Sequence, residues 1–300
     1  MAIKCFLLSP RGFCSGVTRA VNMAEQVLKL YGTMYVVEDI IHNRVFMNNM
    51  KARGIVKISS IDEAPNGSVI MFSAHGVTPQ AVEKAEEKEL TIIDGTCPIV
   101  RAIQNECKKE VEAGKKIVII GNTAHAEIVA LLGYTDETEA FVVYEEGDID
   151  LLPSFVGDKV VYFTQTTLDY SHVQTIVKKL KEKIPHIESS SQDDICYATR
   201  ERQEVVRKIA SSVDLLIVVG SAHSSNARRL QEVALLSGAK SAILVDSHNE
   251  LDNKLLKRVK TIAVTSSAST PESVVQELIG HLKENLDLEI ENFELPNKNG

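Results

Sequence analysis

The sequence predicts an α/β protein with three similar units, mainly parallel sheets, and a pseudo-threefold arrangement around one central site. Three observations predict this class: short apolar runs, amphipathic stretches that alternate with them, and a threefold recurrence of one cysteine with two polar loops. The boundaries we expect are 1–96, 97–193 and 194–282, followed by a surface tail over 283–300.

The composition suits such a protein. The chain has 300 residues, of which 44% are hydrophobic and 25% charged, which is ordinary for a soluble globular chain. The formal net charge of −8 argues against a general affinity for nucleic acid. The apolar run before Pro10 is too short for a signal peptide and no run reaches membrane-spanning length, so we expect a cytoplasmic protein.

The strands are predicted from apolar runs of four to six residues, because strands buried on both faces of a parallel sheet need apolar side chains at successive positions. These runs fall within 33–38, 68–73, 115–121, 159–164, 214–220, 241–246 and 261–266. The helices are predicted from amphipathic stretches between the strands, several of which end at glycine. They cover 20–32, 79–89, 101–115, 171–184, 202–212 and 227–240.

One arrangement recurs three times along the chain. A cysteine stands where an extended or turn segment meets a helix, at Cys14, Cys97 and Cys196. A polar loop lies 28 residues after each cysteine and follows a strand, at His42, His125 and Ser224. A second polar loop follows a later strand, around His75, Thr166 and Ser269. Since ligands of parallel sheets bind beyond the carboxyl ends of the strands, we expect the three cysteines to meet in one active site.

Three converging thiolates can bind zinc or an iron–sulfur cluster. Structural zinc sites usually draw their ligands from close pairs, whereas these cysteines are single and far apart in sequence. A [4Fe–4S] cluster with only three cysteines keeps one iron open, and that iron can act as a Lewis acid and deliver electrons. We interpret Cys5, in an apolar strand, and Cys107, in an amphipathic helix, as packing residues.

The loops around the cysteines are rich in hydrogen-bonding groups. Histidines and hydroxyls at helix starts can bind a diphosphate, and the chain has no GxxxxGK[ST] motif. Glu127 is the one carboxylate within a candidate loop. It is either a proton donor in a closed site of low dielectric or a helix-start glutamate that complements the dipole.

The stretches together resemble the 4-hydroxy-3-methylbut-2-enyl diphosphate reductase family, the LytB proteins. The matching stretches, in the family's order, are "PRGFCSGV", "IIHNR", "SAHGV", "DGTCP", "HAE", "TQTTL", "DDICYAT.ERQ" and "VGS..SSN..RL". The resemblance implies a trefoil of three α/β units. It also implies reductive removal of an allylic hydroxyl to give isopentenyl and dimethylallyl diphosphate, the last step of the methylerythritol phosphate route to isoprenoids.

The same resemblance implies roles for individual residues. It places one [4Fe–4S] cluster per chain, with one open iron site, on Cys14, Cys97 and Cys196. It places the diphosphate among His42, His75, His125, Ser224, Ser225, Asn226 and Ser269. Thr166 then helps to orient the substrate hydroxyl, and Glu127 supplies protons. Because no GxGxxG fingerprint or flavin motif is visible, we expect electrons from a separate ferredoxin- or flavodoxin-type carrier.

Five positions depart from the family's usual pattern. Proline is usual at Ala126, glycine at Ala130, serine or threonine at Ala227, and alanine followed by glycine at Ser266 and Ser267. None of them removes an expected ligand, but they can alter loop flexibility or substrate fit.

Two other classes of protein remain open from the residues alone. An iron–sulfur redox sensor would use the same cysteines without a diphosphate site, and the chain shows no basic helix for reading DNA. A zinc-dependent hydrolase would use the same thiolates with a colourless metal.

Overall fold

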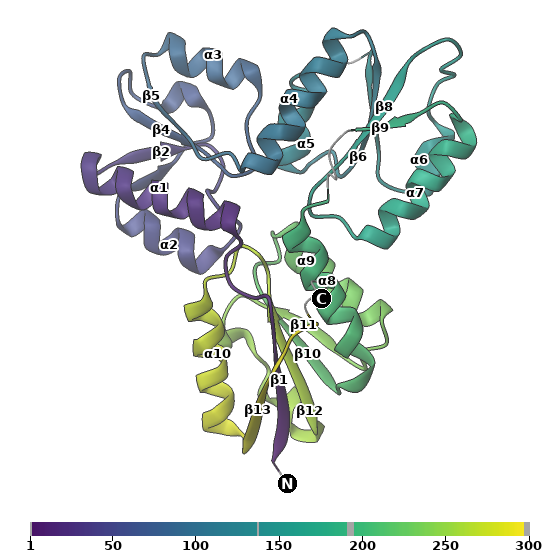
Figure 1. Ribbon diagram of the computed structural model, residues 1–300. Helices are drawn as coiled ribbons and strands as arrows, with labels where there is room; N and C mark the ends of the chain where they lie inside the picture. The colour runs from purple at the N-terminus through teal and green to yellow at the C-terminus, as the bar shows by residue number, and fades with distance from the viewer. Residues whose placement is uncertain (1, 137, 191–194, 297–300) are drawn as a thin grey trace. The chain divides into compact units, whose positions relative to one another are not determined.

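The computed structural model describes residues 2–136, 138–190 and 195–296. Its strands form one five-stranded and two four-stranded sheets, flanked by helices (Figure 1). All the strand pairs that the structure describes are parallel. The predicted α/β class with parallel sheets is therefore confirmed.

The chain separates into two compact units. We call Met1–Ser15, His42–Asn49 and Tyr197–Gly300 the terminal unit, and Gly16–Ile41 and Met50–Cys196 the middle unit. The division into three lobes that share one site stays a prediction.

The middle unit holds both four-stranded sheets. The first sheet has the order β3-β2-β4-β5, and its strands are β2 (Met34–Val36), β3 (Ile55–Lys57), β4 (Val69–Phe72) and β5 (Thr91–Asp94). The second has the order β7-β6-β8-β9, and its strands are β6 (Lys116–Ile120), β7 (Ala140–Val143), β8 (Val160–Thr164) and β9 (Glu188–Ser189). The helices that lie mainly in this unit are α1 (Ser15–Tyr31), α3 (Pro79–Glu87), α4 (Pro98–Glu112), α5 (Ala126–Leu132), α6 (Glu146–Asp150) and α7 (Tyr170–Lys183). Helix α2 (Arg44–Ala52) begins in the terminal unit and ends in the middle unit.

Strand β6 shows why these strands are continuously apolar. Ile117 and Ile119 pack into one buried cluster with side chains of α4 and α5. Val118 and Ile120 point to the opposite face and pack with side chains of α7. Because successive side chains of a strand alternate between the faces, a sheet covered on both faces needs an apolar residue at each position.

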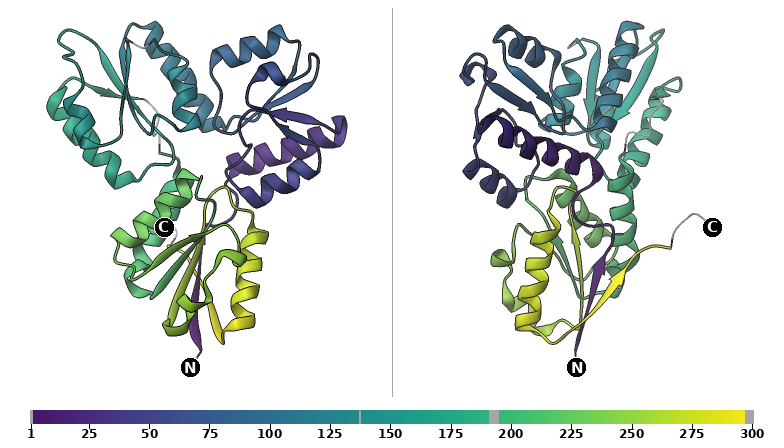
Figure 2. Two further views of the ribbon diagram at one scale, coloured as in Figure 1. Left: turned by 180° about the vertical axis from the view of Figure 1, so that it is seen from behind. Right: turned by 60° about the vertical axis from the view of Figure 1, so that its left-hand side comes forward.

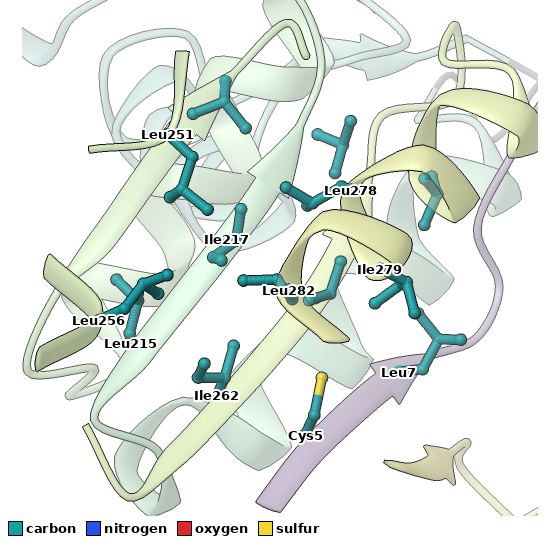
Figure 3. Close-up of a cluster of buried hydrophobic side chains, with 14 of the residues drawn as sticks. Cys5, Leu7, Leu215, Ile217, Leu251, Leu256, Ile262, Leu278, Ile279 and Leu282 are labelled. Atoms are coloured by element: carbon teal, nitrogen blue, oxygen red, sulfur yellow. The ribbon is translucent and has the colours of Figure 1, made fainter. Parts of the chain in front are cut away.

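The terminal unit holds the five-stranded sheet, with the order β11-β10-β12-β1-β13. Its strands are β1 (Ile3–Leu8), β10 (Leu215–Val219), β11 (Ala242–Val245), β12 (Thr261–Ser266) and β13 (Leu288–Phe293), and its helices are α8 (Tyr197–Ile209), α9 (Ser225–Leu236) and α10 (Glu272–Asn285). Helix α10 covers one face, where Leu215, Ile217 and Leu278 pack in the cluster of Figure 3. Helices α8 and α9 cover the other face, toward which Leu216 and Val218 point.

Two segments differ from the sequence prediction. Strand β1, which we placed in the unit 1–96, pairs with β12 of the third sheet. Residues 288–293, which we expected to form a surface tail, are strand β13 and pair with β1, as the turned views in Figure 2 show. The physical reason is that β1 would otherwise expose its hydrogen-bonding groups at an open edge. The alternating apolar and polar residues of Leu288–Phe293 suit a strand that is exposed on one face.

The seven predicted strands and six predicted helices all correspond to observed elements. The sequence reading missed α2, α5, α6 and α10, and it began both α1 and α8 five residues late. Helices α2, α5 and α6 have nine residues or fewer, which gives a helical period little room to show. In the part of the chain that the structure describes, no helix combines the length and the apolar character that crossing a membrane requires.

Candidate active site

The predicted site residues follow the carboxyl ends of three neighbouring strands in each sheet. In the first sheet, the residues after β2, β4 and β5 are His42, His75 and Cys97. In the second sheet, those after β6, β8 and β9 are His125, Thr166 and Cys196. In the third sheet, those after β10, β12 and β1 are Ser224, Ser269 and Cys14. Each cysteine thus follows the fourth strand in the order of its sheet, whereas our boundaries placed it near the start of a unit.

A backbone hydrogen bond is repeated at the three cysteines. In each sheet, the cysteine N–H donates to a carbonyl oxygen in the loop that follows the neighbouring strand. The pairs are Cys14 with Ala268 at 3.1 Å, Cys97 with Ala74 at 3.0 Å and Cys196 with Thr166 at 3.2 Å. The repeat predicted from sequence spacing is therefore also a repeat of local structure. Residues 191–194, which precede Cys196 in the matching stretch "DDICYAT.ERQ", lie outside the described residues.

The five cysteines, none of which is in a disulfide, fall into two groups. Cys5 and Cys107 are fully buried, while Cys14, Cys97 and Cys196 are partly exposed. Burial raises the pKa of the Cys5 thiol to about 11, against a weaker opposing effect of Lys283. Because the thiolate is the form that binds metals, Cys5 is unsuited to ligation at neutral pH.

The Cys97 sulfur lies against a position that has no side chain. A Cβ atom built on Gly16, at the start of α1, would lie 2.6 Å from Cys97 Sγ. In the same helix, Arg19 Nη1 donates to the Thr96 carbonyl oxygen at 3.0 Å. Cys97 itself is the N-cap residue of α4, where free N–H groups and the helix dipole favour a thiolate.

Two of the predicted histidines lie together in the middle unit. The ring centroids of His75 and His125 are 5.5 Å apart, with an edge-to-face angle of 86°. His75 Nδ1 lies 3.2 Å from the hydroxyl of buried Ser73. His125 Nδ1 accepts from the Glu127 N–H at 3.3 Å, so the neutral imidazole carries its proton on Nε2. An Nε2–H group can donate to an anionic ligand.

Glu127 is buried, with 5% of its surface exposed, and both carboxylate oxygens contact Thr166. Oε1 accepts from the Thr166 N–H and Oε2 from the Thr166 hydroxyl, each at 2.8 Å. Burial raises the pKa of Glu127 to about 7, although the two hydrogen bonds from Thr166 lower it. Glu127 is therefore divided between its acid and carboxylate forms near neutral pH, as a general acid needs.

In the terminal unit, the start of α9 presents the predicted serines and asparagine. The Ser224 hydroxyl caps the helix by accepting from the Ala227 N–H at 3.3 Å. Asn226 is 4% exposed, and neither Oδ1 nor Nδ2 has a hydrogen-bond partner among the described residues. Since buried polar atoms are normally satisfied, this side chain fits a site that a polar ligand completes.

The Ser269 hydroxyl contacts two groups of the terminal unit. It donates to the His42 carbonyl oxygen at 3.2 Å, and its oxygen lies 3.1 Å from the Ser267 hydroxyl. Ser267 is also 3.0 Å from the hydroxyl of Thr270, which donates to the Val219 carbonyl oxygen at 2.9 Å. Because the single Thr270 proton is used there, the Ser267 hydroxyl is the donor to Thr270, and its oxygen accepts from the Ser269 N–H at 3.4 Å.

Three of the remaining departures from the family pattern occupy buried positions. Ala130 is 2% exposed and Ala227 is fully buried. A Cβ on Gly220 would lie 2.9 Å from the Ala227 Cβ, so Ala227 packs against the strand end. Ser266 is fully buried and accepts from the Gly12 N–H at 2.8 Å. Ala126 begins α5, and nothing in the structure gives it a further role.

The sequence reading missed Gly16 and Arg202. The signal for Arg202 is visible in the sequence, because a charged residue stands on the apolar face formed by Val205, Val206 and Ile209. Gly16 gives no such signal, since only the position of the Cys97 sulfur explains it. The structure thus brings His75 to His125, Glu127 to Thr166 and Ser269 to the backbone of His42. The meeting of the three sulfurs stays a prediction.

Comparison with known proteins gives consistent matches over the chain. A protein from Tropheryma whipplei (strain TW08/27) called 4-hydroxy-3-methylbut-2-enyl diphosphate reductase is 42% identical over 280 residues, covering 93% of this chain and 89% of the relative. A protein of the same name from Ehrlichia ruminantium (strain Gardel) is 36% identical over 296 residues, covering 98% and 89%.

A solved structure also matches. The E-1-hydroxy-2-methyl-but-2-enyl-4-diphosphate reductase from Plasmodium falciparum aligns with a TM-score of 0.93 and 36% identity, covering 99% of this chain and 94% of that chain. The model of the family described as LytB protein matches residues 5–283. The match to the family model and the identity to these relatives show that the chain belongs to the LytB protein family.

Proposed function

We propose that this protein reduces 4-hydroxy-3-methylbut-2-enyl diphosphate to isopentenyl and dimethylallyl diphosphate, the terminal step of the non-mevalonate route to isoprenoids. Membership of the LytB family supports the proposal most directly, because several relatives carry the name of this reductase. The buried Glu127–Thr166 pair supplies what this reaction needs from the chain, a proton donor whose pKa lies near neutrality.

The three partly exposed cysteines fit a [4Fe–4S] cluster. Each is a cysteine outside any disulfide that follows the fourth strand of a sheet and is fixed through its backbone N–H. The absent side chain at Gly16 makes room for the Cys97 sulfur. Cys14 precedes Gly16 by two residues, which limits the distance between their Cα atoms to about 7 Å. Chain length therefore allows Cys14 and Cys97 to ligate the same group.

A bound cluster with three cysteine ligands would supply electrons and an open iron with Lewis-acid character. The chain's own residues bind and orient the substrate. His75, His125 and the start of α9 offer N–H and O–H donors suited to phosphate oxygens. Ser269 and the side chain of His42 complete the proposed diphosphate site.

Proton delivery falls to Glu127 and Thr166. When Glu127 is protonated, its O–H can donate to Thr166 Oγ1, and the Thr166 hydroxyl then donates to the substrate hydroxyl. The 2.8 Å distance between Thr166 Oγ1 and Glu127 Oε2 suits this transfer. The leaving hydroxyl departs as water, and the reduced allylic carbon skeleton takes a proton at either end, which accounts for two products.

The proposal is tested by anaerobic purification and a reduction assay. We expect a brown protein that, once reduced, is reoxidised by the substrate and releases both C5 diphosphates. A ferredoxin- or flavodoxin-type protein should sustain turnover. A reduced cluster that ignores the substrate would favour a redox sensor, and a colourless zinc-containing protein would favour a hydrolase.

A further inference from the structure

The loop before Cys14 is held by two buried side chains. The Gly12 N–H donates to Ser266 Oγ at 2.8 Å, and the Gly12 carbonyl oxygen accepts from Arg202 Nη2 at 2.8 Å. Ser266 is fully buried and Arg202 is 2% exposed. All three residues belong to the terminal unit. The backbone two residues before the Cys14 thiol is therefore fixed on both its donor and its acceptor side.

Arg202 joins this loop to the helix that follows Cys196. Its second terminal nitrogen, Nη1, donates to the Ala198 carbonyl oxygen in the first turn of α8 at 2.9 Å. The forked guanidinium thus bridges the start of α8, one residue after Cys196, and the loop two residues before Cys14. A single amine could not reproduce the two directions of this fork.

The buried position of Arg202 carries a cost, and the conformation at Gly12 requires glycine. Arg202 occupies the apolar face of α8, where burying a cation is expensive and a hydrophobic residue would pack. Gly12 has a φ of +74°, and a Cβ there would lie 3.4 Å from Glu272 Oε2. Glu272 in turn accepts from Arg11 Nε at 2.9 Å. Glycine adopts this φ without strain but is conformationally free, so the loop needs partners on both sides of the peptide to keep a single geometry.

We propose that Arg202 is a positioning residue for Cys14, which it fixes relative to the start of α8 through the Gly12 carbonyl. This inference rests on the proposed function, in which Cys14 and Cys196 ligate one cluster. Arg202 sets the geometry of the Cys14 thiol before any iron binds, so that the ligand is preorganised. Ser266 holds the opposite side of the same peptide.

The test measures the reactivity of individual thiols in the full chain purified without metal. Each cysteine is alkylated with iodoacetamide over time, and its modification is followed by mass spectrometry of peptides. In Arg202→Met, we expect Cys14 to react about tenfold faster, the factor that corresponds to the loss of one hydrogen bond from a charged group. Cys97, in the middle unit, serves as the internal reference and should not change. Lys208→Met, which removes an exposed charge from the same helix, is the matched control.

An unchanged Cys14 rate, or an equal rise at Cys14 and Cys97, overturns the proposal. If Arg202→Met does not fold, Ser266→Ala carries the test, because it removes only the bond to the Gly12 N–H and should also raise the Cys14 rate alone. Arg202→Lys should behave like the methionine variant. A rate like that of the wild type in the lysine variant would show that charge, rather than the forked bridge, is what matters, and would overturn the proposal.

A second readout uses protein reconstituted with iron and sulfide. We expect the electron paramagnetic resonance spectrum of the reduced protein to change in Arg202→Met and to stay the same in Lys208→Met. A wild-type protein that assembles no cluster would defeat the proposed function, while the alkylation result would still decide the role of Arg202.

Discussion

Glu127 shows how burial can bring the pKa of a carboxyl group close to neutrality. Its carboxylate accepts two hydrogen bonds from Thr166, which alone would favour ionisation. Burial at 5% exposure outweighs them and raises the pKa of Glu127 to about 7. The sequence left two readings of this residue open, and its burial and contact with Thr166 favour the proton donor over a solvated helix-start charge.

Replacing Glu127 by glutamine should abolish proton delivery and leave the cysteines untouched. We expect the visible absorbance of the purified protein to stay the same and kcat to fall by about 10²- to 10⁴-fold. In the wild type, kcat should fall as the pH rises through about 7, because the raised pKa of Glu127 means that the acid form is lost there. Rate measurements between pH 5.5 and 9, a range chosen around that pKa, check both expectations. Full activity in the variant would rule out the proposed role.

Ser267 is a second residue whose effect can be derived from its contacts. Its hydroxyl donates to Thr270 and accepts from the Ser269 N–H at 3.4 Å, so it holds the backbone that carries the Ser269 hydroxyl. In Ser267→Ala, we expect KM for the diphosphate substrate to rise by about two- to tenfold and kcat to stay within error. Steady-state kinetics at fixed electron-donor concentration measure this, and an unchanged or lower KM would contradict this role.

At the scale of elements, a missing side chain at the start of helix α1 allows the helix to lie against Cys97. Its second residue, Gly16, lets the backbone approach the Cys97 sulfur, and Arg19, one turn later, holds the Thr96 carbonyl. The start of α1 therefore supports a cysteine that lies about 80 residues further along the chain. The amphipathic pattern predicts the helix but not this contact, because a close approach between distant segments leaves no periodic signal.

Gly16→Ala should disturb the Cys97 ligand without unfolding the protein. The added Cβ would lie 2.6 Å from Cys97 Sγ, so the sulfur or the helix must move. We expect the variant to bind less iron after reconstitution and to release it faster to a chelator. Gly147→Ala is the control, since the same methyl group in helix α6 of the same unit meets no heavy atom within 4 Å. Equal iron content in the two variants would contradict the assignment.

At the scale of the whole chain, the fold repeats one arrangement of four strands and a cysteine three times. Four strands have the same order in each sheet, and the cysteine follows the fourth strand each time. In the third sheet, that fourth strand is β1, so the first strand of the chain lies inside the five-stranded sheet of the terminal unit. Strand β13 then covers the edge that β1 would leave open.

Much of this was predictable from the sequence. The seven apolar runs form strands because both faces of the sheets are covered. The equal 28-residue spacing from each cysteine to the next polar loop reflects the same strand order in each sheet. The pairing of β1 with β12 was not predictable, because a short apolar run does not indicate which edge it joins. Likewise, the contact of Arg202 with Gly12 joins residues 190 positions apart, which no local pattern encodes.

The central claim is that Cys14, Cys97 and Cys196, one from each sheet, ligate a single [4Fe–4S] cluster. The direct measurement is iron and sulfide per chain in anaerobically reconstituted Cys→Ala variants, with Cys107→Ala as the buried control. We expect about four iron and four sulfide in the wild type and in Cys107→Ala, and a large loss when any one of the three is replaced. Full iron and sulfide content in a variant of Cys14, Cys97 or Cys196 would contradict the account.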